Sequence, residues 1–173
     1  KQWEILLDID QLAETEKENW IYKGVDSLGP ARERCIIELA PGGTDTAVYR
    51  EFDIPSHSFV KDGFNVPLAK TNLCWENRDQ LLIATDWGAG SLNTSGYARI
   101  LKRWKRGTPL SAAETLLETD VEETFIYPID LEHAGQRVCF VMRGHDFYHF
   151  SFYLVNSAGT LSQLPLPQKC GLS

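Results

Sequence analysis

Short runs of apolar, β-branched and aromatic residues alternate with polar turns along the whole chain. Three segments share the order of strand, short polar turn and strand, which is the pattern of a β-hairpin. Their turns are rich in Gly, Pro, Asn, Asp or charged residues, which favour reversal of the backbone. The segments are WIYKGVDSLGPARERCIIEL from Trp20, LAKTNLCWENRDQLLIATDW from Leu68 and FIYPIDLEHAGQRVCFVMRG from Phe125.

A second hairpin follows each of these segments, with turns expected at residues 41–43, 107–109 and 156–159. The repeating unit is therefore a four-stranded meander of roughly 50 to 65 residues, which is in the range of propeller blades. Radial repetition of such sheets protects strand edges in β-propellers. We predict an all-β fold, a partial propeller of about three blades within one domain; a β-sandwich is the alternative. The blades are expected at approximately residues 3–60, 64–119 and 122–170.

Helical signal is scarce. Residues 11–19 (QLAETEKEN) predict about one helical turn, and 111–118 (SAAETLLE) allow a helix but occupy the place of an outer strand, so a strand is predicted there. The acidic start DIDQLAETEKE lacks the glycine and the terminal glutamate spacing of a calcium loop. We interpret it as a solvated connection between blades.

Composition and charge narrow the possible partners. The 173 residues are 43% hydrophobic and 24% charged, with a net charge of −7, which argues against a nucleic-acid-binding face. Strand alternation divides the basic run 102–106 between two faces, with Trp104 packed beside Lys and Arg stems. No apolar run is long enough to span a bilayer. The chain begins at Lys1 with no signal-peptide pattern, which suggests a fragment of a longer protein.

The cysteines and histidines indicate neither a metal site nor a cofactor. Cys35, Cys74, Cys139 and Cys170 form no C-x-x-C pair, and the first three lie in apolar runs, which predicts buried reduced thiols and favours a cytoplasmic location. His145 and His149 are four residues apart, a spacing of about 13 Å along a strand, too far for one ion. We predict a polar loop between strands there, and no metal or cofactor.

The segment DWGAGSLNTSGYAR, residues 86–99, is too long for a hairpin turn and joins two strong strands. Long loops on a rigid scaffold often carry function. Trp87, Tyr97 and Arg99 are therefore candidates to face a substrate channel or an adjoining catalytic domain. In the alternative interpretation, the loop is ordered by its own hydrogen bonds, with Trp87 and Tyr97 wedged between blades.

The chain resembles the propeller domain of the prolyl oligopeptidase family. The resemblance is carried by WEILLDID, ENWIYKGVD, AVYREFDIPSHSFV and the run from Phe64 to Leu110, and it is strongest from Trp3 to Pro109. More narrowly, it is similar to a bacterial branch with the pattern G-T-D-[FW]-G-x-G-S-x-T-x-S-G-Y-x-R, in which Ala84 stands here where glycine is usual. The resemblance implies a serine endopeptidase that cleaves short peptides after proline, in which a seven-bladed propeller excludes folded proteins from an α/β-hydrolase domain.

No catalytic residue is predicted in this chain. The nearest approach to a G-x-S-x-G nucleophile elbow, residues 88–92 (GAGSL), lacks the last glycine and precedes no helix. We therefore predict a non-catalytic segment that gates substrate access, with the hydrolase domain absent here. Three blades of seven would leave blade flanks uncovered, so self-association is expected. The alternative is a stand-alone propeller or sandwich module for protein binding.

Overall fold

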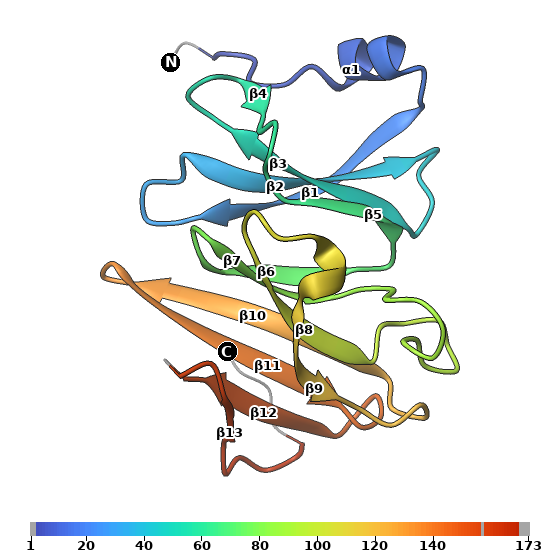
Figure 1. The fold of residues 1–173 in the computed structure, drawn as a ribbon, viewed down its shortest axis with the longest axis vertical. Helices are drawn as coiled ribbons and strands as arrows, with labels where there is room; N and C mark the ends of the chain where they lie inside the picture. The colour runs from blue at the N-terminus through green and yellow to red at the C-terminus, as the bar shows by residue number, and fades with distance from the viewer. Residues whose placement is uncertain (1–2, 157, 170–173) are drawn as a thin grey trace. The chain divides into compact units, whose positions relative to one another are not determined.

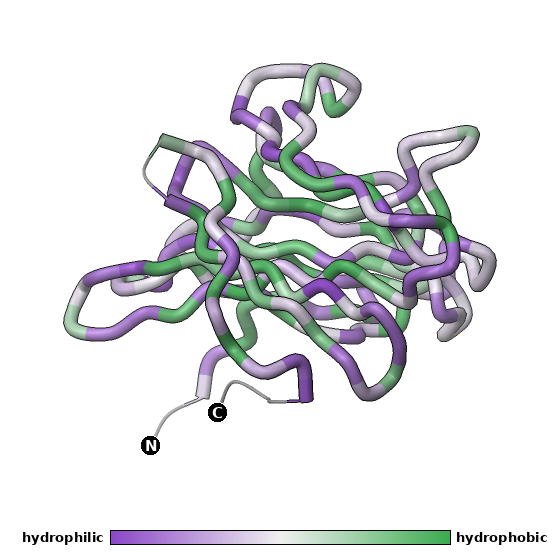
Figure 2. Tube along the Cα trace, turned by 90° about the horizontal axis from the view of Figure 1, so that it is seen from below, coloured by the Kyte–Doolittle hydropathy of each residue, from purple (hydrophilic) through white to green (hydrophobic). Residues whose placement is uncertain are grey.

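The computed structural model describes residues 3–156 and 158–169, and the predicted all-β architecture is confirmed. The chain divides into two compact units, one ending at Ala69 and the other beginning at Lys70, and each is described by itself. Antiparallel strands in three sheets form the framework of both units (Figure 1). Apolar residues follow the strands, whereas the connecting turns are mostly polar (Figure 2). Within the described residues, no helix is long and apolar enough to cross a membrane.

The first unit is a sheet preceded by one helix. The strand order is β1-β2-β3-β4, and β5 also pairs with β3. The expected hairpins β1–β2 and β2–β3 are both present. The core of this sheet includes Cys35, Leu39 and Phe52. The elements are α1 Ile9–Glu16, β1 Trp20–Leu28, β2 Arg34–Pro41, β3 Ala47–Asp53, β4 Ser58–Phe59 and β5 Asn65–Ala69.

The fourth strand position of the first sheet is split between β4 and β5. The chain turns away at residues 60–63 around the buried Glu51, whose carboxylate accepts a hydrogen bond from the Phe64 amide at 2.9 Å. Gly63 permits this approach, because a Cβ there would lie 2.8 Å from the Glu51 carboxylate. The sequence predicts a second unit from residue 64, but residues 65–69 pair with the first sheet. The strand expected from Leu68 accordingly begins at Asn72.

The helix α1 is longer than predicted and begins earlier. The Asp8 carboxylate accepts a hydrogen bond from the Gln11 amide at 3.0 Å and caps the helix. A capping residue followed three positions later by Glu or Gln is a known start signal of a helix, so the prediction of a solvated connection over residues 8–18 was wrong. Glu16 accepts a hydrogen bond from Trp20 Nε1 at 2.8 Å and pairs with Arg50 at 2.9 Å. The acidic segment at the start of the chain therefore contains a helix that contacts the sheet through Trp20 and Arg50.

The second unit contains two four-stranded meanders, β6-β7-β8-β9 and β10-β11-β12-β13. The predicted hairpins β6–β7, β8–β9, β10–β11 and β12–β13 are confirmed. The strand predicted over residues 111–118 covers only 114–118, because residues 110–112 form a short 3-10 helix. Strand β10 packs against β6, and the shared core includes Leu82, Leu101, Ile126 and Val141. The elements are β6 Asn72–Asn77, β7 Gln80–Ala84, β8 Ile100–Lys105, η1 Leu110–Ala112, β9 Glu114–Glu118, β10 Phe125–His133, β11 Gln136–Gly144, β12 Phe150–Val155 and β13 Leu161–Gln163.

Candidate functional site

The loop between β7 and β8, residues 86–99, is held by hydrogen bonds to its own backbone and to a neighbouring segment. Ser91 Oγ accepts a hydrogen bond from the Trp87 amide at 2.8 Å. Asn93 Oδ1 accepts hydrogen bonds from the amides of Ser95 and Tyr97, at 3.0 and 2.9 Å. Asn93 Nδ2 donates to the carbonyl oxygens of Glu123 and Thr124, at 2.7 and 2.8 Å. The loop is thereby tied to the segment that enters β10.

The buried Ser91 has no nucleophilic role in this arrangement, because its hydroxyl lies within the hydrogen bonds that shape the loop. Trp87 is half-buried, and its Nε1 donates to the carbonyl oxygen of Ile100 at 2.9 Å. The Lys102 ammonium lies 4.5 Å from the centroid of the Trp87 ring, a cation–π distance. Trp87 therefore contributes to the order of the loop.

Arg99 has several partners within the second unit. Its Nε donates to the Gly90 carbonyl at 2.8 Å, and its Nη1 contacts both a Glu118 carboxylate oxygen and the Thr119 carbonyl at 2.8 Å. The guanidinium thus joins the loop to the end of β9. Its hydrogen-bonding capacity is largely used inside the molecule, which favours a structural role for this candidate.

Tyr97 differs from the other two candidates because its side chain reaches solvent. It is 45% exposed, and the Lys70 ammonium lies 4.7 Å from its ring centroid. Its ring forms part of the wall of an open pocket of about 410 Å³. Of the three candidates predicted from the sequence, only Tyr97 lines this pocket.

The pocket is formed by side chains from both sheets of the second unit and from three of their loops. Four of its lining residues are aromatic, one is methionine, and three are small polar residues. A cavity of this size, lined mainly by apolar groups with a few polar ones, has the character of a ligand site. The lining residues are Asn72, Ser95, Tyr97, Thr124, Phe125, Tyr127, Met142 and Phe147.

Most of this lining was not predicted from the sequence. Phe125 and Tyr127 lie on β10 and Met142 on β11, where an alternating strand pattern gives no reason to single them out. Phe147 lies in the β11–β12 loop and is 79% exposed. The one signal available in the sequence was an aromatic residue, Phe147, within a polar loop.

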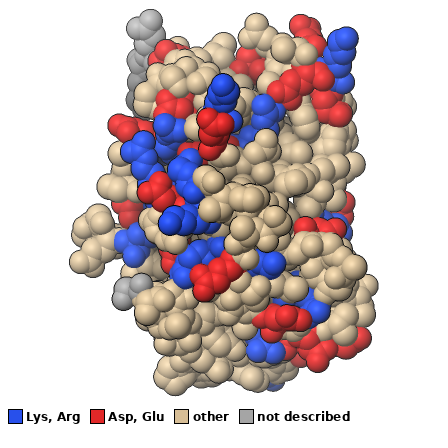
Figure 3. All heavy atoms as spheres, in the orientation of Figure 1, with Lys and Arg blue, Asp and Glu red and all other residues tan. Residues whose placement is uncertain are grey.

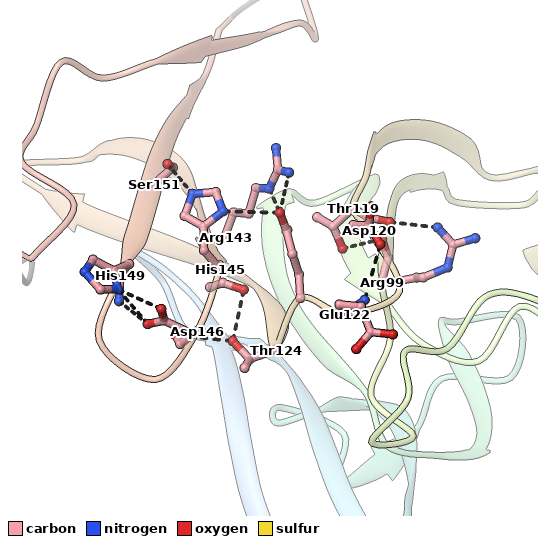
Figure 4. A network of polar contacts seen from close by, with 12 residues as sticks. Arg99, Thr119, Asp120, Glu122, Thr124, Arg143, His145, Asp146, His149 and Ser151 are labelled. Atoms are coloured by element: carbon pink, nitrogen blue, oxygen red, sulfur yellow. Dashed lines mark hydrogen bonds and ion pairs between the residues drawn. The ribbon is translucent and has the colours of Figure 1, made fainter.

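The loop at 145–149 is shaped by one carboxylate. Asp146 Oδ1 accepts hydrogen bonds from the amides of Tyr148 and His149, at 2.7 and 2.8 Å, and His149 Nδ1 lies 2.7 Å from Oδ2 (Figure 4). The hydrogen bond from the Tyr148 amide, followed by that of the His149 ring, lowers the pKa of Asp146. This turn holds Phe147 at the rim of the pocket.

A second polar cluster, formed by Glu123, Arg143 and His145, lies next to this loop. Arg143 pairs with Glu123 through two hydrogen bonds of 2.7 and 2.5 Å, and His145 Nδ1 lies 3.2 Å from the same carboxylate (Figure 4). Burial raises the pKa of Glu123, but hydrogen bonds from Arg143 and His145 outweigh it, so the pKa is lowered. The bond to Glu123 also raises the pKa of Arg143. His145 and His149 therefore lie in a loop, as predicted, and face different carboxylates.

Ser151, His145 and Glu123 lie in the order of a catalytic triad. His145 Nε2 is 2.7 Å from Ser151 Oγ, and Nδ1 is 3.2 Å from Glu123. Ser151 is only 5% exposed and lies within the regular strand β12, whereas a nucleophile must reach its substrate. Glu123 is also held by Arg143. The cluster consequently supports the 145–149 loop structurally.

The basic run 102–106 is divided as the strand pattern predicted. Arg103 forms a bidentate pair with Glu76 at 2.5 and 2.6 Å, and this bond raises its pKa. Trp104 is 6% exposed, with its Nε1 donating to the Thr108 carbonyl at 2.9 Å. On the face shown in Figure 3, basic and acidic side chains are interspersed. No continuous basic stripe results on that face.

Comparison with solved structures defines the class of fold. The chain matches a post-proline cleaving enzyme from Rickettsia typhi with a TM-score of 0.89 and 25% identity, covering 97% of this chain and 26% of that one. It matches oligopeptidase B from Leishmania major with a TM-score of 0.69 and 14% identity, covering 96% of this chain and 22% of that one. The three meander sheets are thus part of a β-propeller, as predicted.

The sequence relatives of the chain are described as peptidases. The chain is 33% identical to a protein described as an uncharacterized peptidase of Sinorhizobium fredii, over 96% of this chain and 24% of the relative. It is 26% identical to an uncharacterized peptidase of Rickettsia prowazekii, over 90% of this chain and 23% of the relative. No family model matches. The chain spans about a quarter of the length of these relatives, and its likeness to them and to the solved post-proline cleaving enzyme agrees with the predicted resemblance to an N-terminal propeller fragment of the prolyl oligopeptidase family.

Proposed function

We propose that this segment gates and guides short peptides in a prolyl oligopeptidase-like serine endopeptidase that cleaves after proline. The observation that carries the proposal is the open aromatic pocket of about 410 Å³ around Tyr97. Its polar lining atoms and exposed rings suit an extended peptide with apolar side chains. In this proposal, peptides enter past the pocket, whereas folded proteins are excluded.

The geometry of the two loops supports this role. Both the 86–99 loop and the 145–149 loop are internally hydrogen-bonded, so Tyr97 and Phe147 are presented on ordered backbone. An ordered wall binds with less loss of conformational entropy than a flexible one. The catalytic nucleophile, base and acid are supplied in this proposal by a hydrolase domain of the parent chain.

The test uses the intact parent peptidase with substitutions in the pocket. Tyr97→Ala and Phe147→Ala remove aromatic contacts of about 1 kcal/mol, so each is expected to lower kcat/KM for short proline-containing peptides roughly fivefold. Tyr148→Ala is the matched control, because Tyr148 is 76% exposed on the same loop but does not line the pocket. Equal effects of Phe147→Ala and Tyr148→Ala would contradict the proposal.

Substitutions of Trp87 and Arg99 test how far the peptide site extends along the loop. If the channel includes them directly, Trp87→Ala and Arg99→Ala in the parent change peptide cleavage. Unchanged kinetics in both variants would restrict the site to the Tyr97 pocket and remove these two residues from the channel. Comparing a short chromogenic peptide with a folded protein substrate measures the gating itself, because a functional gate admits only the former.

A protein-binding module is the second candidate function, favoured by exposed apolar side chains on β10 and β11. Tyr127, Leu131 and Val138 are 46%, 53% and 40% exposed. A surface of this kind also suits contact with another protein. The downstream sequence of the parent gene separates the two candidates, since a G-x-S-x-G elbow within a βαβ pattern is required only by the peptidase.

A further inference from the structure

Two aromatic rings of the Tyr97 pocket are held in a row on one face of the β10–β13 sheet. Phe125 and Tyr127 are two residues apart in β10 and both line the pocket, so they lie about 7 Å apart along one face of the strand. The Phe125 ring lies over β11 at Gly144, where a Cβ would be 2.9 Å from the ring. Its centroid is also 6.0 Å from that of Phe150. Packing on both sides therefore fixes the Phe125 end of this row.

The hydroxyl groups of Tyr97 and Tyr127 are available to a ligand. Neither hydroxyl forms a hydrogen bond with any other residue that the structure describes, and the two side chains are 45% and 46% exposed. The Ser95 hydroxyl, which also reaches the pocket, has no such bond within the described ranges. Each hydroxyl can donate one hydrogen bond. The pocket therefore combines apolar ring faces with uncharged donors.

The charges at the pocket disfavour an ionised ligand. Among the described residues that line it there is no acidic or basic side chain, so a charged group placed between the rings would lose water without gaining a partner. The Lys70 ammonium lies 4.7 Å from the Tyr97 ring centroid and would repel a second cation at that ring. The aromatic lining is therefore better suited to a neutral group than to a lysine or arginine side chain, although such rings can bind cations.

A proline-rich segment in the polyproline II conformation matches these features. Proline has no N–H, and the polyproline II helix has no internal hydrogen bonds, so its carbonyl groups need donors and little else. Residues two apart in this helix are separated by about 6 Å, close to the spacing of Phe125 and Tyr127. Other domains bind such segments in aromatic-lined grooves, because the preformed helix loses little entropy on binding. An extended peptide with free N–H groups would also require acceptors, which a sheet edge supplies better.

We propose that the Tyr97 pocket binds a proline-rich stretch of peptide in the polyproline II conformation. Proline rings pack against Phe125 and Tyr127, and peptide carbonyl oxygens accept hydrogen bonds from the hydroxyls of Tyr97 and Tyr127. The inference rests on the proposed function, in which the pocket admits peptide substrates, and it names the class of peptide that is favoured. Short peptides with several prolines are therefore preferred over equally short peptides that share only the residues at the cleaved bond.

The binding test uses the intact parent peptidase, treated with a serine-directed fluorophosphonate so that peptides bind without being cut. Isothermal titration calorimetry compares hexaproline with a hexapeptide of alternating leucine and serine, both with blocked termini. Tyr97→Phe and Tyr127→Phe remove only a hydroxyl, so each is expected to weaken hexaproline binding about threefold to tenfold. The affinity for the leucine–serine peptide and the melting temperature are expected to stay unchanged.

Tyr148→Phe is the matched control, because Tyr148 is 76% exposed on a neighbouring loop but does not line the pocket. It is expected to change neither affinity. Equal weakening of both peptides by Tyr97→Phe or Tyr127→Phe would mean that the pocket takes apolar peptides in general. That result, or unchanged hexaproline binding in both variants, would overturn the proposal.

Cleavage kinetics of the untreated parent separate this inference from the proposed function. Two substrates share the residues at the cleaved bond, but one carries two further prolines where the other has alanines. The proline-rich substrate is expected to have a kcat/KM roughly fivefold higher, and this ratio is expected to approach one in Tyr127→Phe. If Tyr97→Ala lowers cleavage of both substrates by the same factor, the proposed function stands and the proline preference is wrong. If hexaproline binds as expected but no pocket variant alters cleavage, the proline site stands and its role in admitting substrates is wrong.

Discussion

The two faces of the β10–β13 sheet both carry apolar side chains but differ in what covers them. On one face, Ile126, Cys139 and Val141 pack with the β6–β9 sheet, and none is more than 4% exposed. On the other face, Tyr127 pairs with Met142 and Leu131 pairs with Val138 across β10 and β11. This second set, Tyr127, Leu131, Met142 and Val138, remains half-buried or exposed and is called the open face below.

Apolar side chains on both faces indicate that this sheet is suited to burial on both sides. Strands with apolar residues on both faces are typical of sheets buried on both sides, whereas a sheet with one solvated face alternates with polar residues. The open face begins at the proposed peptide pocket, because Tyr127 and Met142 line it. One apolar face therefore stabilises the unit, and the other is available for a neighbouring sheet, a second chain or a ligand.

The largest expected effect is a difference in unfolding free energy between substitutions on the two faces. Ile126→Ala deletes a fully buried side chain and is expected to cost about 2–4 kcal/mol of unfolding free energy. Leu131→Ala, on the open face, is expected to cost less than about 0.5 kcal/mol. Urea unfolding followed by tryptophan fluorescence measures both. Equal losses would mean that the open face is covered within the isolated chain.

An effect of intermediate size is expected on the self-association of the isolated chain. The isolated chain is expected to form dimers or larger assemblies, because burying the open face removes apolar area from water. The double substitution Leu131→Glu and Val138→Lys is expected to shift it towards monomer in light scattering. Val121→Lys is the control, since Val121 is 44% exposed but lies in the segment before β10. A monomeric unsubstituted chain in dilute solution would refute the association.

The smallest expected effect is on the pH dependence of stability, and it comes from Glu123 at the polar edge of the covered face. The lowered pKa of Glu123 means that its stabilisation is present above the unfolded value of about 4.3 and is lost as pH falls through the folded value. Glu123→Gln is therefore expected to flatten the acid limb of stability against pH below about pH 5. Unfolding midpoints between pH 3 and 7 measure this. Glu122→Gln, at the neighbouring position, is the control; an identical change in both variants would show that the Arg143 pair is not its source.

Hairpins were the most predictable part of the fold, because their signals are local. The β10–β11 turn illustrates this: Ala134 and Gly135 both have positive φ, 51° and 76°, and the sequence AG between two apolar runs predicts the reversal. The split of the fourth strand into β4 and β5 was not predictable in this way. It depends on Glu51, thirteen residues before Phe64, accepting a hydrogen bond inside the turn.

The candidate site was only partly predictable. Tyr97 was correctly placed in a long loop, and it does line the pocket. Trp87 and Arg99 belong to the same loop, but their polar atoms are engaged by Ile100, Gly90 and Glu118. Whether a loop side chain points outward depends on the hydrogen bonds available around it, and a single sequence does not display them.

The alternation of apolar and polar residues, together with turn chemistry, determined by itself the meander of hairpins. Those properties are local, since side chains point to opposite faces at every second residue and turns require few residue types. Only the tertiary structure decided which apolar face is covered, and which distant residues meet. Tyr97 joins Phe125 and Met142 at the pocket, and Cys74 and Cys139 belong to one core cluster, because two sheets pack together. Packing between sheets depends on the fit of whole surfaces, so no short sequence window contains it.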